Sequence, residues 1–208
     1  MKVVIVTVPM KAARTVNPIL YPVDGNKALE YEKPVRCPIN SILAKTLKKN
    51  ERVKVVYIMT PGKNSECVQN RKNFMKELDG INEGIGARIS YEIVEMEFLP
   101  TKKTYNKLIT DLTKKIPKNA EIFTDITFGS KPEILSYFCA LRFVEEFRDA
   151  VVQYIVYGKV EFNIVTGHIE HPMIFDITSL YYLFKLIGAM GGADSKTAST
   201  MLKNFFAM

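Results

Sequence analysis

Short apolar segments recur along this 208-residue chain, and a segment with helical periodicity follows most of them. Three of the apolar segments, Val3 to Val8, Val53 to Met59 and Val151 to Tyr157, are rich in β-branched residues and show almost no alternation. Such segments are typical of strands buried on both faces. Strands that alternate with helices need right-handed crossovers and form a mostly parallel sheet. The sequence therefore predicts an α/β, Rossmann-like three-layer fold.

The remaining segments complete this pattern. The segment Ile89 to Met96 alternates apolar with polar residues, which predicts an edge or half-exposed strand, and Ala120 to Phe123 is a further buried strand. We expect a C-terminal β hairpin from Val160–Val165 and Met173–Ile177, turning around Gly167 and His168. The expected helices run from Pro38 to about Asn50, from Ser65 to Leu78 with Asp79 and Gly80 as the stop, from Thr101, and from Glu133 to Asp149. Two terminal helices, Ser179 to Ile187 and Asp194 to Phe206, follow.

Composition narrows the classes of partner. The formal charge is +7, but no block of five or six like charges is present, so a discrete polyanion is a better match than duplex DNA. The three cysteines, Cys37, Cys67 and Cys139, lack metal-ligand spacing and are predicted to be reduced core residues. The longest apolar stretch, Leu180 to Met190, is too short to span a bilayer. We expect a cytoplasmic protein without a signal peptide or a membrane partner.

The most informative polar segment is the junction from Thr124 to Pro132. It lies between a buried strand and a long helix, where α/β proteins hold phosphates. Ser130 is predicted to cap the helix, with Glu133 completing a capping box and Pro132 in the first turn. Gly129 allows a tight bend and close approach of a ligand to the backbone.

Lys131 carries a positive charge at the positive end of the helix dipole, where acidic residues are favoured. A cation in this place suggests an anion nearby. The alternative is that Asp125, Thr127 and Ser130 satisfy the turn while Lys131 points to solvent. The spacing matches neither a P-loop nor the G-x-G-x-x-G of dinucleotide-binding folds.

Topology brings this junction together with other loops. In a parallel sheet, ligands bind beyond the carboxyl ends of the strands. The loops that begin at Pro9, Thr60, Phe98, Thr127 and Gly158 are predicted to meet at that edge. The first of these, Pro9 to Lys33, is long and irregular, which is typical of functional or mobile loops.

The junction resembles the second ligand motif of CARF (CRISPR-associated Rossmann fold) domains through Asp125-x-Thr127-x-Gly129-x-Lys131. Tyr157-Gly158, Ile174-x-Asp176-Ile177-Thr178 and a polar loop after the first strand are also similar to that family. The resemblance extends to about Ile187. It implies a homodimer that binds cyclic oligoadenylate, the second messenger of type III CRISPR antiviral defence, and that regulates an effector. Some family members are ring nucleases.

The resemblance implies a ligand site with cyclic tetra-adenylate (cA4) or cyclic hexa-adenylate (cA6) as ligand and no cofactor or metal. Its expected residues are Met10, Lys11, Arg14, Thr15, Thr60, Pro61, Phe98, Asp125, Thr127, Phe128, Gly129, Ser130, Lys131, Tyr157 and Gly158. The chain departs from the family pattern at two places in this expected site. Many members carry a second glycine where Phe128 stands, and residues 10–15 replace a simple Ser or Thr after the first strand. Residues 1–178 would form the ligand-binding domain. Residues 179–208 would serve dimerisation or link to an effector domain beyond residue 208.

Two other functions remain open. In a metal-independent ring nuclease, a ribose 2′-OH would attack the adjacent phosphate, with Lys131 stabilising charge and Thr127, Ser130 or Thr15 assisting. A DNA-binding regulator would need a recognition helix rich in basic and amide side chains. The last helix offers only Lys196, Lys203 and Asn204, so this function ranks well behind. His168 and His171 are predicted to be surface residues rather than metal ligands.

Overall fold

A computed structural model describes residues 1–12, 16–60, 65–97, 101–163 and 169–206, and it has the predicted α/β architecture. Within these residues six strands form one sheet in the order β3-β2-β1-β4-β5-β6. The strands are β1 (Lys2–Thr7), β2 (Arg52–Met59), β3 (Arg88–Glu95), β4 (Glu121–Asp125), β5 (Val151–Phe162) and β6 (Ile169–Asp176). All pairs are parallel except β5 with β6, and β3 is an edge strand as predicted.

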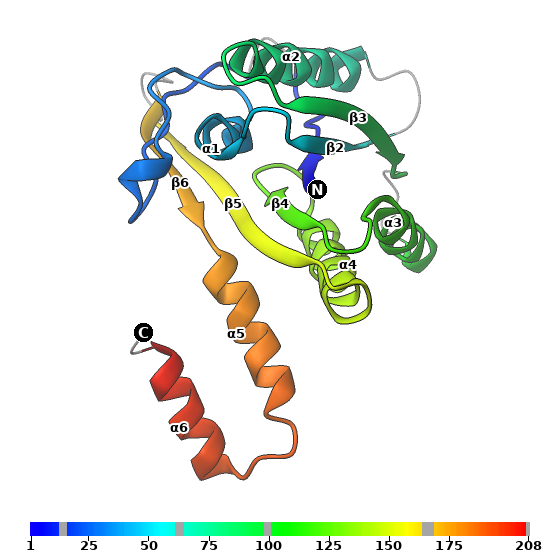
Figure 1. Ribbon diagram of the computed structural model, residues 1–208, viewed down its shortest axis with the longest axis vertical. Helices are drawn as coiled ribbons and strands as arrows, with labels where there is room; N and C mark the ends of the chain where they lie inside the picture. Colours follow the sequence, from blue (N-terminus) through cyan, green and yellow to red (C-terminus); the bar gives the residue numbers. More distant parts are fainter. Residues whose placement is uncertain (13–15, 61–64, 98–100, 164–168, 207–208) are drawn as a thin grey trace.

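Helices cover both faces of the sheet (Figure 1). The helices are η2 (Lys27–Leu29), α1 (Pro38–Thr46), α2 (Ser65–Asn82), α3 (Lys102–Lys115), α4 (Lys131–Arg148), α5 (Thr178–Ala189) and α6 (Ser195–Phe206). Alternate residues of β1 separate the two cores: Val4 and Val6 pack with α1 and α2, whereas Val3 and Ile5 pack with α3 and α4. Burial on both faces explains the unbroken apolar strands.

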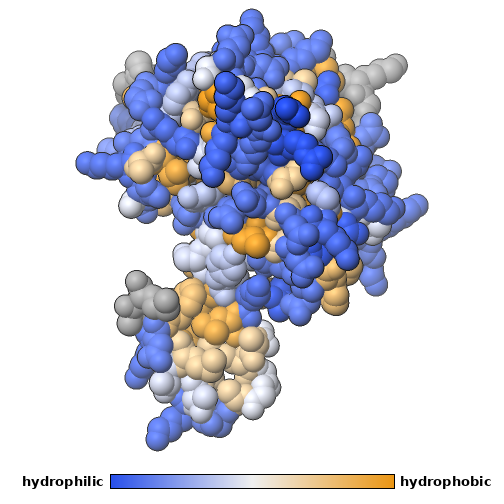
Figure 2. All heavy atoms as spheres, in the orientation of Figure 1, coloured by the Kyte–Doolittle hydropathy of each residue, from blue (hydrophilic) through white to orange (hydrophobic). Residues whose placement is uncertain are grey.

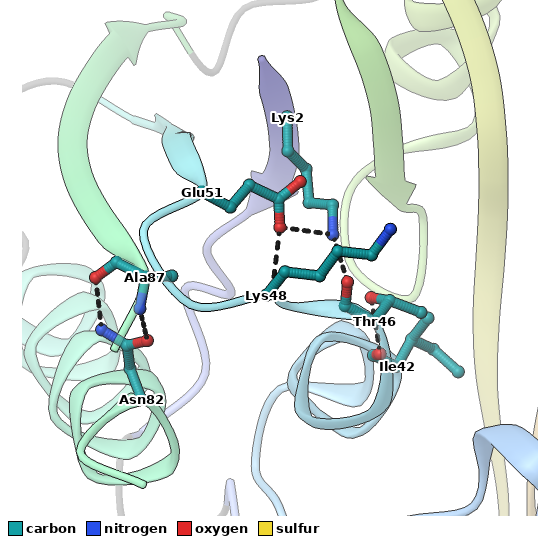
Figure 3. Close-up of polar contacts among 7 residues, drawn as sticks. All are labelled: Lys2, Ile42, Thr46, Lys48, Glu51, Asn82 and Ala87. Atoms are coloured by element: carbon teal, nitrogen blue, oxygen red, sulfur yellow. Dashed lines mark hydrogen bonds and ion pairs between the residues drawn. The ribbon is translucent and has the colours of Figure 1, made fainter. Parts of the chain in front are cut away.

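Helix ends follow the local sequence with two exceptions. Helix α1, expected to reach about Asn50, ends at Thr46, because Leu47 is already extended. Thr101 caps α3 as expected, and Asp149 ends α4 in the left-handed conformation. The predicted stop of α2 at Asp79 and Gly80 is wrong, because the helix continues to Asn82. There the side chain of Asn82 donates to the carbonyl of Ala87 and accepts from its amide, which supplies the terminating turn (Figure 3).

The C-terminal hairpin is present, but β5 is longer than expected. Gly158 does not end the strand, which continues to Phe162 and pairs antiparallel with β6. An added Cβ at Gly158 would lie 2.5 Å from Cγ of Pro38, so glycine is needed here for close packing of α1 rather than for a turn. The expected hairpin turn at Gly167 and His168 lies outside the described residues.

The long first loop contributes to the core where it is described. Tyr21, Val23 and Leu29 are buried, and Val23 forms a parallel bridge with Ile174 of β6. The prediction for cysteines is correct for Cys37 and Cys67 but wrong for Cys139, which is exposed. Cys139 lies on the outer face of α4. Apolar residues extend around this helix beyond the side that packs on the core.

A buried lysine joins β1 to the end of α1 (Figure 3). Lys2 Nζ donates to the carbonyl oxygen of Thr46 at 2.7 Å and forms an ion pair with Glu51 at 3.2 Å. Burial lowers the pKa of Lys2, and the Glu51 carboxylate opposes this shift. The cation lies at the negative end of the α1 dipole, so it stabilises the helix end opposite to the ligand edge. None of the helices formed by the described residues is long and apolar enough to cross a membrane.

Candidate functional site

A cavity of about 900 Å³ opens at the carboxyl edge of the sheet. The strand order reverses between β1 and β4, and ligands of open α/β sheets bind at such a point. The cavity is formed by the segments that follow these two strands, by the end of β2, and by the first turns of α3 and α4. Its lining residues are Thr7, Val8, Pro9, Met10, Lys11, Ile58, Met59, Thr60, Met96, Tyr105, Thr127, Phe128, Gly129, Ser130, Pro132 and Glu133.

Hydrogen bonds hold the rim on the β1 side. The fully buried Asn70 of α2 donates through Nδ2 to the carbonyl oxygens of Pro9 and Lys11, both at 2.9 Å. The hydroxyl of Thr60 donates to Sδ of Met10 at 3.3 Å and so connects the segments after β2 and β1. Met10, Lys11 and Thr60, three of the predicted ligand residues, therefore occupy defined positions on one side of the cavity.

The other side is the N-terminus of α4, where the predicted capping box is confirmed. Ser130 Oγ accepts from the amide of Glu133, and the Glu133 carboxylate accepts from the amide of Ser130. Gly129 has φ = 108°, and an added Cβ would lie 3.0 Å from the Glu133 carboxylate. Only glycine adopts this φ without strain and leaves room for the Glu133 carboxylate, so this turn depends on Gly129.

Glu133 does more than cap the helix. Its side chain is 4% exposed, and its Oε1 accepts from the hydroxyls of Thr7, at 2.9 Å, and of Tyr137. Burial and the nearby Glu133 carboxylate raise the pKa of Tyr137 well above its ordinary value, so its hydroxyl stays protonated as a donor. This buried network fastens the start of α4 to the end of β1. The spacing of Ser130 and Glu133 predicted the cap but not the two hydroxyl partners.

The capping box limits which groups at the start of α4 can bind an anion. The Glu133 carboxylate already lies near the positive helix end, and Pro132 has no N–H. Among the described residues, no acceptor is found for the Lys131 amide and no ion pair for the Lys131 or Lys11 side chains. Lys131 is exposed and lies between two lining residues, Ser130 and Pro132. Anion binding would therefore depend on the lysines more than on the helix dipole.

Asp125 lies away from the cavity, in contrast to the predicted ligand role. It is 1% exposed and accepts hydrogen bonds from the amides of Thr127, at 2.8 Å, and Ile39, at 3.0 Å. Burial raises the pKa of its carboxyl group. Ile39 lies in the first turn of α1, so Asp125 caps that helix from the end of β4. Its role is to position the turn that follows β4.

Two further predicted residues lie on β5 and do not line the cavity. Gly158 donates its amide to Thr127 Oγ1 at 2.8 Å, which fixes the Thr127 side chain at the cavity wall. Tyr157 is partly exposed on the strand beside it. Phe128 lines the cavity and stacks on Phe74 of α2, with ring centroids 6.2 Å apart, so it belongs both to the wall and to the core.

Four predicted site residues, Arg14, Thr15, Pro61 and Phe98, lie outside the described residues. The sequence prediction missed Thr7, Ile58 and Met59 on strands, Met96 directly after β3, and Tyr105 on α3. The positions of Thr7 and Met59 at strand ends were a usable signal, because strand ends meet at this edge. Tyr105 gave none, since its spacing indicates only the apolar face of α3.

Comparison with known proteins gives no family assignment. The chain matches no protein-family model, and a search of curated proteins finds no match to it. Function is therefore inferred from the cavity and the residues around it.

Proposed function

We propose that this protein binds a cyclic oligoadenylate, cA4 or cA6, as a homodimeric sensor that regulates an effector in a type III CRISPR antiviral system. The observation that carries the proposal is the cavity at the point where strand order reverses, with Lys11 in its lining and Lys131 between the lining residues Ser130 and Pro132. The resemblance of the segment from Asp125 to Lys131 to the ligand motif of CARF domains supplies the ligand class.

The apolar part of the cavity suits adenine rings. Met10, Met59 and Met96 line it together with Tyr105 and Phe128. Thioether and aromatic groups pack on the faces of bases, and hydroxyls such as that of Thr60 can bond to base edges. A flat, uncharged heterocycle is thus a better occupant of this part than a phosphate.

The phosphates would bind at the rim. Lys11 lines the cavity on the β1 side, and Lys131 lies between the lining residues Ser130 and Pro132 on the other side, where its amide would add a backbone donor. Charged hydrogen bonds from lysine to phosphate are stronger than neutral ones. The net charge of +7 adds a general attraction for a polyanion.

A ring of this size requires two protomers. Ligand pockets hold about 300–1,000 Å³, and one cavity of about 900 Å³ accommodates part of a cyclic tetranucleotide or hexanucleotide. Rings with an even number of nucleotides match a two-fold axis, which presents every group twice. Each protomer would hold one half of the ring.

Hydroxyl positions favour binding over cleavage. Thr127 Oγ1 already accepts from the Gly158 amide, and Ser130 Oγ accepts from the Glu133 amide. Two of the three predicted hydroxyl assistants are therefore engaged in holding the turn, and the third, Thr15, lies outside the described residues. The ring-nuclease function, which yields linear products with 2′,3′-cyclic phosphate ends, is the second candidate.

One assay tests the proposal and separates it from the second candidate. The purified chain is incubated with cA4, cA6 and linear tetra-adenylate in the presence of EDTA, and retention and cleavage are followed by chromatography. We expect retention of one cyclic ligand, intact, with weaker retention of the linear control. Cleavage in EDTA would instead establish the nuclease, and failure to retain either ring would refute both.

A further inference from the structure

Helices α5 and α6 form an arm that leaves the body of the protein (Figure 1). The first turns of α5 are attached: the hydroxyl of Tyr181 donates to Glu145 at 2.6 Å, and that of Tyr182 donates to the carbonyl oxygen of Val152 at 2.8 Å. Lys185 then forms an ion pair with Glu145 at 3.6 Å. Beyond these contacts the chain turns back through residues 190–194 into α6.

Helix α6 buries none of its residues. Its apolar positions Ala198, Met201, Leu202 and Phe205 have the i, i+3, i+4, i+7 spacing of a helix face that packs against another surface. Isolated helices shorter than about 12–15 residues are only marginally stable in water. Ala198, Leu202 and Phe205 are half-buried, whereas Met201 and Phe206 stay 39% and 68% exposed, so one copy of the chain covers the apolar residues of α6 only in part.

Helix α5 also carries exposed apolar residues along its length. Leu180, Phe184 and Ile187 are exposed at helical spacing, and Phe184 retains 66% of its surface in contact with solvent. Figure 2 shows that apolar residues gather on the arm, in contrast to the mostly hydrophilic body. No charged residue interrupts the three positions, and the neighbouring Lys185 is paired with Glu145.

We infer that the arm of a second copy covers this surface, so that two helical hairpins form a four-helix bundle around a two-fold axis. Both helices of one arm have an apolar face, and pairing two identical hairpins places all of these faces in one core. The exposed apolar side chains of the arm, Leu180, Phe184, Ile187, Met201 and Phe206, offer on the order of 500 Å² per protomer, and the half-buried residues of α6 bring this toward the ~800 Å² of a standard interface. The bundle needs no ligand.

The test is sedimentation equilibrium of the ligand-free full-length chain from about 1 to 100 μM, beside Phe184→Glu and a matched control, Phe147→Glu. Phe147 lies on α4 outside the arm and is 66% exposed, as is Phe184. Wild type is expected at twice the chain mass of 23.7 kDa. Phe184→Glu places two buried charges in the bundle and should weaken dimerisation by about 100-fold or more. Phe147→Glu should change it by less than about 3-fold.

Three results would overturn the inference. They are a monomeric wild type across this range, a dimer unaffected by Phe184→Glu, and disruption by Phe147→Glu alone, which would assign the interface to α4. A monomeric wild type that sediments with anionic vesicles through Phe184 would assign the arm to a membrane surface instead. Because no ligand is present, these outcomes are independent of cyclic oligoadenylate binding.

Discussion

Replacing Asp125 with alanine is expected to lower the free energy of unfolding by about 4 kcal/mol, a large part of the stability of a typical domain. The carboxylate accepts from the amides of Ile39 and Thr127 in the protein interior. Alanine leaves both donors without a partner, and each orphaned buried donor costs about 1–3 kcal/mol. Urea unfolding followed by circular dichroism measures the change.

Asp111→Ala is the control for this prediction. Asp111 is partly exposed and forms surface ion pairs with Lys107 and Lys114, so its removal should cost less than about 1 kcal/mol. Similar losses for the two variants would contradict the capping role of Asp125. A normally stable Asp125→Ala protein that no longer binds ligand would instead restore Asp125 as a ligand residue.

The effect of Asp125→Ala should also depend on pH. Burial raises the pKa of Asp125 above 3.8, so the folded protein binds this proton more tightly than the unfolded chain does. The stability contributed by the carboxyl group is therefore greatest at acid pH and decreases as pH rises through the raised value. The difference in unfolding free energy between wild type and variant should become smaller from acid to neutral pH. A difference that grows would contradict a raised pKa for the buried carboxyl group.

Replacing Lys131 with alanine is expected to weaken cyclic oligoadenylate binding by about 100-fold or more. A charged hydrogen bond contributes about 1.5–3 kcal/mol, and a shared ring would lose this contact twice. Because Glu133 already offsets the helix dipole, the backbone alone would not compensate. Stability should change by less than about 0.5 kcal/mol, since the side chain is exposed. Isothermal titration calorimetry measures the affinity.

Lys118→Ala provides the matched control. Lys118 is exposed and precedes β4, at the opposite edge of the sheet. Its replacement removes the same charge from the protein as that of Lys131. Its effect on affinity should stay below about 3-fold. Equal losses for the two variants would show that net charge, rather than the position of Lys131, accounts for binding.

The sequence predicted the features that depend on local chemistry. Unbroken apolar segments such as Val3 to Val8 indicated strands buried on both faces, and their alternation with helices fixed the parallel sheet. Ser130 and Glu133 predicted the capping box because both partners lie within one turn. The position of the cavity followed from the topology of the sheet.

Features that depend on contacts distant in sequence were missed. Asp125 was assigned to the ligand because nothing nearby shows that the first turn of α1 packs against the end of β4. Gly158 suggested a turn, but Pro38 occupies the space beside it. The bonds from Thr7 and Tyr137 to Glu133 join residues on different elements, so periodicity could not indicate them.

The central claim is that the anion of the ligand lies at the turn between β4 and α4. The most direct test is a titration of ¹⁵N-labelled protein with cA4 and with cA6, monitored by the backbone amide resonances. The account predicts that one ring causes its largest shifts at Gly129, Ser130 and Lys131, with smaller shifts at Lys11. Saturable binding whose largest shifts lie elsewhere, or no shifts with either ring, would contradict it.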